Sequence, residues 1–552
     1  MTNKELADLL LPNVSSDIEY YESKYPERNL KEGTIVTRFA PSPTGFVHMG
    51  SLLASFIEKK AASDTDGIFF LRIEDTDQKR EVENGVSGII NDLNNFGITI
   101  DEGMISETEE KGNYGPYIQS KRKEIYQTYV KHLIEIGLAY PCFCSAEEIE
   151  ETRQIQEKRK QRIGYYGRYA KCRRLSLEEI KEKVESGEKY IIRFKSPGSF
   201  DNKIKVNDIV KGEIEFPEND MDLVILKSDG LPTYHFAHAI DDHLMHTTHV
   251  IRGDEWISSL PIHVQLFKSL NFKIPKYAHL SPLMKEEDGK KRKLSKRKDP
   301  EAAVSFYHEK GIPVEAVKLY LMTIANTNFE QWYDCNKDKG INDFKFDFKK
   351  ISSSGALFDV DKLYNISKNY ISYLKATEVF EGAYNWAKEF DKEFAEILDK
   401  NKDYAINLFN IEREQKKPRK DYSCYSDIKN QIWYMFDDLY VDVNGYEFQS
   451  ITNKEEVNNI LELYLDKYYN ESDDKETWFN KLKDLSGELG YAREVKEYKN
   501  NPDSYKGHVG DISMVLRVAL TSKSMTPDLY ELMKLLGRDK VVQRFRNFIE
   551  QK

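Results

Sequence analysis

Two short stretches nearly 250 residues apart carry the side chains best suited to chemistry in this chain. The first, PSPTGFVHMGS at Pro41–Ser51, places a histidine and small residues at a turn; the second, KLSKR at Lys293–Arg297, places cations around a serine. A histidine before a helix can donate to a phosphate oxygen, and lysines can neutralise phosphate charge. Together they predict the two halves of an ATP site that activates a carboxylic acid by adenylation, which neither stretch predicts alone.

The residues around the first stretch predict a strand, a turn, a helix and a second strand. Thr34–Ala40 is a β-branched and aromatic run suited to a buried strand, and Ile68–Ile73 is another. Between them, apolar residues recur at helical spacing from Gly50 onward. The N-terminus of such a helix offers unpaired backbone N–H groups to a phosphate, and His48 lies just before it.

The second stretch lies in a strongly basic run. Seven of the nine residues in Lys290–Lys298 are cationic. Such a run is usually a solvated loop or a nucleic-acid patch. Here it follows the strand-like Tyr277–Met284 and precedes the helix-like Glu301–Glu309, so we expect a mobile lysine loop that closes over a triphosphate.

These motifs resemble those of the class I aminoacyl-tRNA synthetases, and more narrowly those of the bacterial glutamyl-tRNA synthetases. HMGS at His48–Ser51 occupies the place of the family's HIGH motif, and KLSKR occupies that of KMSKS. Ser51 replaces the final histidine of HIGH, a departure common to the glutamyl branch. The more specific motifs are RFAPSPTG from Arg38, RIEDTD at Arg72–Asp77, LPTYHFA at Leu231–Ala237 and VIRGDEW at Val250–Trp256.

The resemblance runs from about Thr34 to the C-terminus and implies an α/β fold class. It implies a class I Rossmann-like parallel sheet with an inserted acceptor-binding domain, followed by an all-α C-terminal anticodon-binding region. The expected parts are an N-terminal helical extension (1–33), the first half of the Rossmann catalytic domain (34–140), the inserted acceptor-stem-binding domain (141–210), the second half of the catalytic domain (211–285), a stem-contact region with the KMSKS-like loop (286–345) and an α-helical anticodon-binding domain (346–552).

A pocket for glutamate must bind two carboxylates and one ammonium group, so it needs cations placed for bidentate contact. Arg38 and Arg252 both follow β-branched runs, at strand ends that face the crevice where open α/β sheets bind ligands. His238 departs from an asparagine found in some relatives. The resemblance implies a glutamate site made of Arg38, Ala40, Ser42, Glu74, Tyr234, His238 and Arg252.

The resemblance also implies the reaction. The α-carboxylate of glutamate attacks the α-phosphorus of ATP and releases pyrophosphate, and a terminal ribose hydroxyl of tRNA then takes the glutamyl group. No side-chain nucleophile is needed, because the protein supplies alignment and charge, while Mg²⁺ accompanies the ATP. The implied catalytic residues are His48 and Lys296, and the implied ATP contacts are His48, Ser51, Glu255, Lys293, Lys296 and Arg297.

A glutaminyl enzyme is the nearest alternative within the superfamily. Such enzymes typically carry PEPNG and FDDTNP where this chain has PSPTG and IEDTD, so the motifs favour glutamate. The motifs leave open whether glutamine tRNA is charged as well as glutamate tRNA, because many bacterial glutamyl enzymes charge both.

Alternatives from other classes fit the chain less well. A nucleotidyltransferase with an HxGH motif should be much shorter and should lack RIEDTD. A non-catalytic tRNA-binding relative would lose His48 or Lys296, and both are present. The related enzyme that glutamylates a modified anticodon base lacks the C-terminal domain.

The composition is compatible with a multidomain tRNA-binding enzyme. The 552 residues, 40% of them hydrophobic, are enough for several cores. No apolar run could span a bilayer and the N-terminus lacks an export pattern, so we expect a cytoplasmic monomer that binds tRNA, L-glutamate and ATP and no membrane. The net charge is −11, but phosphate contact depends on local patches such as Lys290–Lys298, Lys416–Lys420 and Arg538–Arg546.

Five cysteines without a secretion signal argue against a disulfide framework. Cys142, Cys144 and Cys172 resemble the zinc-binding insertion of some glutamyl enzymes, but structural zinc needs a complete tetrahedral set. Arg174 stands where some relatives have histidine, and Tyr165 or Tyr166 is a weak substitute as fourth ligand. We therefore expect buried free thiols rather than zinc.

Five histidines between His235 and His249 are interleaved with Asp241 and Asp242 and form a second candidate metal site. The segment lies between two strand-like runs and overlaps the substrate motif at Tyr234. Positional roles beside the nucleotide are therefore favoured over metal binding.

Replacing Lys296 with alanine is expected to abolish most glutamate-dependent pyrophosphate exchange and to leave the fold intact, because this lysine neutralises charge that develops on the phosphates. Exchange of labelled pyrophosphate into ATP measures the loss, and circular dichroism checks the fold. Near-normal exchange would remove Lys296 from its predicted role.

Overall fold

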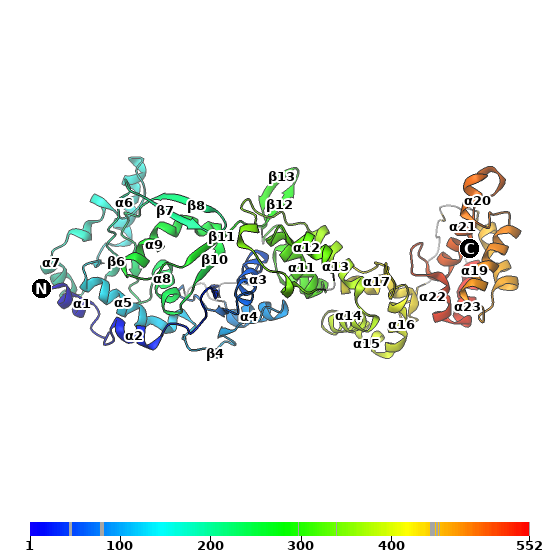
Figure 1. Cartoon of the computed structure of the whole chain (residues 1–552), viewed down its shortest axis with the longest axis horizontal. Coiled ribbons are helices and arrows are strands. Elements are labelled where there is room, and N and C mark those ends of the chain that lie inside the picture. Colours follow the sequence, from blue (N-terminus) through cyan, green and yellow to red (C-terminus); the bar gives the residue numbers. More distant parts are fainter. Residues whose placement is uncertain are drawn as a thin grey trace. The chain divides into compact units, whose positions relative to one another are not determined.

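The structure is a computed structural model of the chain, shown in Figure 1. It describes residues 1–43, 47–77, 82–295, 297–337, 339–441, 448, 451 and 453–550. The chain divides into two compact units. Unit 1 comprises Met1–Phe306 and Val317–Val360, and unit 2 comprises Tyr307–Ala316 and Asp361–Lys552. Among the described residues, no helix has both the length and the apolar character needed to cross a membrane.

The described residues of unit 1 form two four-stranded sheets, one three-stranded sheet and one two-stranded sheet. The first sheet has the order β1 (Val36–Phe39), β2 (Ile68–Leu71), β3 (Glu102–Met104) and β4 (Glu110–Lys111), and the second has the order β10 (His249–Gly253), β11 (Lys276–Leu280), β7 (Lys203–Asp208) and β8 (Gly212–Pro217). In the first sheet β1, β2 and β3 are parallel, as are β10 and β11 in the second. The alternation of such strands with helices is typical of a doubly wound fold.

The two sheets meet at β1 and β10. The Thr248 N–H donates to the Val36 carbonyl oxygen at 3.0 Å, and the Val36 N–H donates to Thr248 Oγ1 at 2.8 Å. Strand order therefore reverses between β1 and β10, which is the position where open α/β sheets bind ligands outside the carboxyl ends of the strands. Arg38 lies near the carboxyl end of β1, and Arg252 lies near that of β10.

Helix α3 (Met49–Ser63) follows β1 and packs against β1, β2 and β10. The expected strands at 34–40 and 68–73 and the helix from residue 50 are therefore confirmed with small differences in their ends. The helix is fixed at its C-terminal end, because the Lys60 ammonium group donates to the carbonyl oxygens of Asn342 (3.2 Å) and Phe344 (2.5 Å).

The segment inserted between the halves of the catalytic sheet carries the antiparallel three-stranded sheet. Its strands are β5 (Ala139–Cys142), β6 (Ile191–Phe194) and β9 (Val224–Leu226), and its helices are α6 (Ala146–Lys158) and α7 (Leu177–Glu185). The Tyr277–Asp208 pairing joins β7 to β11, so residues 203–217 belong to the sheet of the second half. The proposed boundary at residue 210 stays a prediction.

The N-terminal extension forms two short helices on unit 1, α1 (Asn3–Leu10) and α2 (Ile18–Lys24), both packed against α5 (Lys123–Glu135). Arg28 anchors the end of the extension. Its guanidinium donates two hydrogen bonds to Glu102, each 2.9 Å long, and lies 3.9 Å from the centre of the Tyr114 ring. Other helices of unit 1 are α4 (Gly85–Asn95), α8 (Tyr234–Leu244), α9 (Leu260–Ser269) and α12 (Phe329–Cys335).

The basic run differs from the expected loop over its first half. Lys290–Lys293 forms strand β13, which pairs antiparallel with β12 (Met284–Glu287). Arg292 in this hairpin donates to both carboxylate oxygens of Asp299, at 2.6 and 2.7 Å. The predicted local structure was wrong here: Glu286 and Glu287 of β12 lie opposite Lys291 and Lys290 of β13, and these opposite-charge pairs stabilise a hairpin.

Unit 2 is helical and has its own core of buried apolar side chains, which include Phe394, Ile460, Leu516 and Phe545. This confirms the expected helical C-terminal region. Its main helices are α13 (Val360–Tyr373), α14 (Ala376–Phe390), α15 (Lys392–Lys400), α16 (Lys402–Asn410), α17 (Ile428–Ile432), α18 (Lys454–Leu463), α19 (Lys475–Glu488), α20 (Val495–Asn500), α21 (Val509–Thr521), α22 (Leu529–Leu536) and α23 (Arg538–Glu550). Two further helices cross the division between the units: α10 (Ser305–Lys310) belongs mostly to unit 2, and α11 (Val314–Ala325) belongs mostly to unit 1.

Candidate active site

A cavity of about 980 Å³ lies at the carboxyl ends of β1 and β10. The N-terminus of α3, the start of α8 and the hairpin β12–β13 also contribute to its wall. Its lining includes His48 and Ser51 from the start of α3 and the residues Arg38 and Arg252. A cavity of this size accommodates a nucleotide and a small amino acid together.

His48 is the N-cap residue of α3. Its Nδ1 accepts a hydrogen bond from the Ser51 N–H at 3.1 Å, so the proton of a neutral ring lies on Nε2, 3.0 Å from Ser51 Oγ. The side chain is exposed at the cavity wall. The helix start therefore brings backbone N–H groups, the imidazole and the Ser51 hydroxyl group to the cavity wall, an arrangement suited to phosphate.

Arg38 is fixed by a buried network of ion pairs centred on Asp242 of α8. Asp242 Oδ1 accepts from Arg72 Nη1 at 2.7 Å and from Arg38 Nε at 3.3 Å, and Arg72 Nη2 donates to Glu74 Oε1 at 3.1 Å. Burial alone would raise the pKa of Asp242, but the neighbouring Arg72 and Arg38 guanidiniums hold that pKa well below its ordinary value. Asp242 is therefore a permanent anion that orients two arginines.

Arg252 is held by neutral acceptors instead. Its Nε donates to His279 Nε2 at 3.0 Å, and its Nη1 donates to the Tyr234 hydroxyl oxygen at 3.2 Å. The proton of His279 consequently lies on Nδ1, which donates to Asp208 Oδ2 at 2.7 Å. Among the described residues, no carboxylate lies within 4.0 Å of the Arg252 guanidinium. The positive charge of Arg252 therefore has no ion-pair partner in the described protein.

The histidines of this region contact different groups. His263 accepts from Arg252 Nη2 at 3.2 Å and lies 2.9 Å from His235, and burial lowers the pKa of both histidines. His243 and His246 instead contact the N-terminal extension, at Glu22 and at the Tyr25 carbonyl oxygen.

The catalytic-domain family "tRNA synthetases class I (E and Q)" matches residues 34–365, and an anticodon binding domain matches residues 496–549. Over 551 residues the chain is 49% identical to the glutamate–tRNA ligase of Clostridium perfringens (strain SM101), with 100% of each chain covered. The chain belongs to the glutamate–tRNA ligase family.

Other members of the glutamate–tRNA ligase family match over the same length. The ligase of Acetivibrio thermocellus is 47% identical over 550 residues, with 100% of each chain covered. A crystal structure of a glutamate tRNA ligase from Elizabethkingia meningosepticum in complex with its amino acid matches with a TM-score of 0.75 and 27% identity, covering 94% of this chain and 100% of that one. The predicted family and fold class are thus confirmed.

Most of the residues predicted for substrate binding in this ligase family member line the cavity. His238 does not: it is fully buried, with Nδ1 2.8 Å from Asp242 Oδ2 and Nε2 3.1 Å from the Tyr277 hydroxyl oxygen. Arg297 is exposed and outside the cavity lining, and Lys296 lies outside the described residues, although Lys293 lines the cavity. The predicted residues in the lining are Arg38, Ala40, Ser42, His48, Ser51, Glu74, Tyr234, Arg252, Glu255 and Lys293.

The sequence analysis missed the residues that orient the two cavity arginines, namely Asp242, Arg72 and His279. Arg72 was part of the quoted RIEDTD motif, and Asp242 was noted only as a candidate metal ligand. The available signal was two consecutive acids in a segment whose other residues favour a buried helix, because buried carboxylates need cationic partners.

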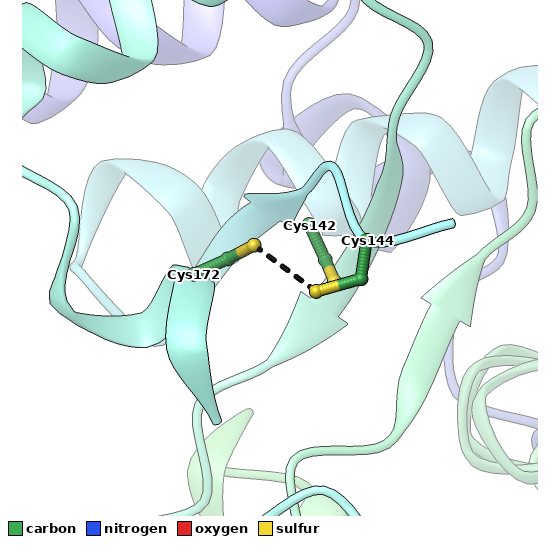
Figure 2. A group of neighbouring side chains, drawn as sticks. All are labelled: Cys142, Cys144 and Cys172. Carbon is green, nitrogen blue, oxygen red and sulfur yellow. Dashed lines mark hydrogen bonds between the residues drawn. The ribbon is translucent and has the colours of Figure 1, made fainter. Parts of the chain in front are cut away.

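A second candidate site lies in the inserted segment, where Cys142, Cys144 and Cys172 come together (Figure 2). Their three Sγ atoms lie within 4.8 Å of one another, with Cys144 and Cys172 3.6 Å apart. The Tyr165 hydroxyl oxygen lies 3.5 Å from Cys142 Sγ and 3.4 Å from Cys144 Sγ. Within the described part of the chain, this is the one group of histidine, cysteine and acidic side chains close enough to hold a metal ion.

Replacing His238 with glutamine is expected to reduce the loss of stability in acid. Burial lowers the pKa of His238 to about 3 from the ordinary 6.5, despite the nearby Asp242. Between these two pH values, His238 of the unfolded chain binds a proton that His238 of the folded protein does not. The contribution of neutral His238 to the free energy of unfolding is therefore fully present above pH 6.5 and is lost as the pH falls.

The free energy of unfolding of the wild type should then fall more steeply, by up to about 1.4 kcal/mol per pH unit, than that of His238→Gln. Urea unfolding of both proteins at about pH 7, 6 and 5 measures the two slopes. Equal slopes would mean that His238 takes up its proton as readily in the folded protein as in the unfolded chain.

Proposed function

We propose that this protein is a glutamate–tRNA ligase, which activates L-glutamate with ATP and transfers it to the 3′ end of glutamate tRNA. The observation that carries the proposal is the cavity, whose lining combines the start of α3, which is suited to phosphate, with Arg38 and Arg252. One cavity lined in this way can bring a carboxylate to a nucleotide phosphate. Membership of the glutamate–tRNA ligase family supports the same activity.

In the proposed complex, the two carboxylates of glutamate bind Arg38 and Arg252. Arg252 is the stronger attractant because its charge is not neutralised by a described carboxylate, and its Tyr234 partner holds it toward the cavity. The ammonium group is assigned to Glu74, which lines the cavity. Ala40 and Ser42 complete the site from the loop after β1, while His238 acts from behind through Asp242.

ATP lies with its phosphates at the start of α3, where His48, Ser51 and Lys293 line the cavity. An oxygen of the α-carboxylate forms a bond with the α-phosphorus as the bond to pyrophosphate breaks. His48 Nε2–H and the α3 backbone donate to phosphate oxygens, and Lys296 and Arg297 neutralise charge when the loop closes. Mg²⁺ bound to the phosphates adds to this charge neutralisation when ATP is present.

The tRNA contacts are proposed for unit 2 and the inserted segment. The anticodon binding domain match covers α20–α23, and Lys416, Lys417 and Lys420 are exposed. Arg544 is excluded from the second basic patch, because it is buried and donates to the Leu520 carbonyl oxygen. Phosphate contact therefore depends on the exposed cations of these patches.

Purified protein is expected to exchange pyrophosphate into ATP with glutamate and not with glutamine, because the cavity offers two arginines to two carboxylates. The assay is run with and without tRNA, because similar enzymes bind tRNA before they activate glutamate. Charging of purified glutamate and glutamine tRNAs in parallel then shows whether one or both are accepted. Exchange with glutamine alone would contradict the proposal.

We further propose that Cys142, Cys144, Cys172 and Tyr165 hold a structural zinc ion. With Zn–S bonds of about 2.3 Å and Zn–O bonds of about 2.0 Å, tetrahedral geometry separates two sulfurs by about 3.8 Å and a sulfur from an oxygen by about 3.5 Å. In the structure, Cys144 Sγ and Cys172 Sγ are 3.6 Å apart, and the Tyr165 hydroxyl oxygen lies 3.5 and 3.4 Å from Cys142 Sγ and Cys144 Sγ, close to these values. This agreement supports zinc over the free thiols that the sequence favoured, with Tyr165 as the fourth ligand.

Protein purified without chelator is expected to contain about one zinc ion per chain, measured by mass spectrometry of the metal. Cys172→Ser should lose most of this zinc because it removes one of three thiolates. Cys335→Ser is the matched control, since Cys335 is exposed and outside the cluster. Zinc-free protein, or equal zinc in both variants, would contradict the proposal.

A further inference from the structure

Glu58 is a buried acidic residue that lines the cavity beside Arg38. The mechanism proposed above gives it no role. Glu58 lies on α3, its residue is 2% exposed, and it lines the same cavity as Arg38 and Tyr234. Its Oε1 is 3.8 Å from Arg38 Nη1, which is too long for a hydrogen bond. Its Oε2 is buried and has no hydrogen-bond partner among the described residues.

An unpartnered carboxylate oxygen in such a place needs an explanation, because a buried polar atom without a partner costs about 1–3 kcal/mol, and more when it is charged. Arg38 does not provide the missing partner. Its Nε is used by Asp242 and its Nη1 is 3.5 Å from the Ile251 carbonyl oxygen. Arg38 therefore contacts Glu58 only through the 3.8 Å ion pair with Oε1, and Oε2 stays buried and without a hydrogen bond in a residue that lines the cavity.

The surrounding charges favour the neutral form of Glu58. Arg38 from β1, Arg72 from just after β2 and Arg122 are balanced by Asp241 and Asp242 from α8 and by Glu74. An ionised Glu58 would be a fourth carboxylate beside three arginines. Burial raises the pKa of Glu58 well above its ordinary value, against the opposing effect of Arg38, and Asp242 raises it further.

We propose that Glu58 is a further residue of the amino-acid site, where its protonated carboxyl group donates a hydrogen bond to the carboxylate that Arg38 binds. The inference rests on the proposed function and extends it to a residue outside the quoted motifs. A neutral acid beside Arg38 adds a donor and leaves the positive charge of Arg252 available to an anionic substrate. An ionised Glu58 would instead repel that substrate.

The test compares Glu58→Ala and Glu58→Gln in pyrophosphate exchange with glutamate, with tRNA present. Loss of a hydrogen bond to a charged group is expected to raise the KM for glutamate about 10- to 100-fold in Glu58→Ala, and to change the KM for ATP by less than about threefold. Glu58→Gln keeps the shape and an N–H donor, so it should restore the KM for glutamate to within about threefold of the wild type.

Lys59→Gln is the matched control on the same helix, because Lys59 pairs with Asp101 at 2.8 Å and is outside the cavity lining. Thermal unfolding of each variant separates binding from stability. With increasing pH, the KM of the wild type relative to Glu58→Gln should stay constant or rise, because ionisation of Glu58 repels the substrate.

Three outcomes would overturn the inference: a Glu58→Ala KM within about threefold of the wild type, a Glu58→Gln KM as high as that of Glu58→Ala, or a relative KM that falls as the pH rises. The second of these would mean that Glu58 binds the ammonium group as an anion. Absence of glutamate exchange in the wild type would refute the proposed function instead, so the two failures are distinguishable.

Discussion

The burial of arginine beside paired aspartates is the interaction on which the amino-acid end of the cavity depends. Asp241 and Asp242 are consecutive on α8, and they accept hydrogen bonds of 2.7 Å from Arg122 and Arg72, respectively. All four side chains are fully buried. Removing one member of such a network would leave an uncompensated buried charge, which costs several kcal/mol. The network therefore ties α8 to Arg38 of β1, to Arg72 just after β2 and to Arg122 just before α5, and Arg38 takes its position from Asp242.

Arg38 and Arg252 illustrate two ways to hold a cation at a ligand site. Arg38 is balanced by an anion and has a defined direction, whereas Arg252 is oriented by Tyr234 and His279, which are neutral. The low pKa of the buried His279 keeps its ring neutral, so it remains an acceptor for Arg252. Neutral hydrogen-bond partners preserve the attraction of Arg252 for a carboxylate, whereas a negatively charged partner would reduce that attraction. The electrostatic asymmetry of the cavity thus comes from the partners of its arginines.

The part of the cavity at the start of α3 depends more on local structure than the part around Arg38 does. A strand, a turn and a helix with histidine at its N-cap are sufficient to produce an anion-binding helix start, and α3 begins within one residue of the expected position. The structure of the basic run Lys290–Lys298 depends instead on contacts with other residues. Lys290–Lys293 pairs with β12, and Arg292 forms ion pairs with Glu287 and Asp299. Charge composition predicts solvent exposure well, but strand pairing depends on which residues lie opposite one another.

The sequence by itself determined the family, the α/β class, the positions of β1, α3 and β2, and most residues of the cavity wall, because motifs and periodicity are local properties of the chain. Only the tertiary structure decided that His238 lies behind the cavity, that Tyr165 joins the three cysteines, and that the cavity-lining Glu58 has a buried oxygen without a hydrogen bond. Each of these depends on distances between side chains from separate elements. Burial, which sets the protonation of Glu58 and His238, likewise exists only after those elements pack together.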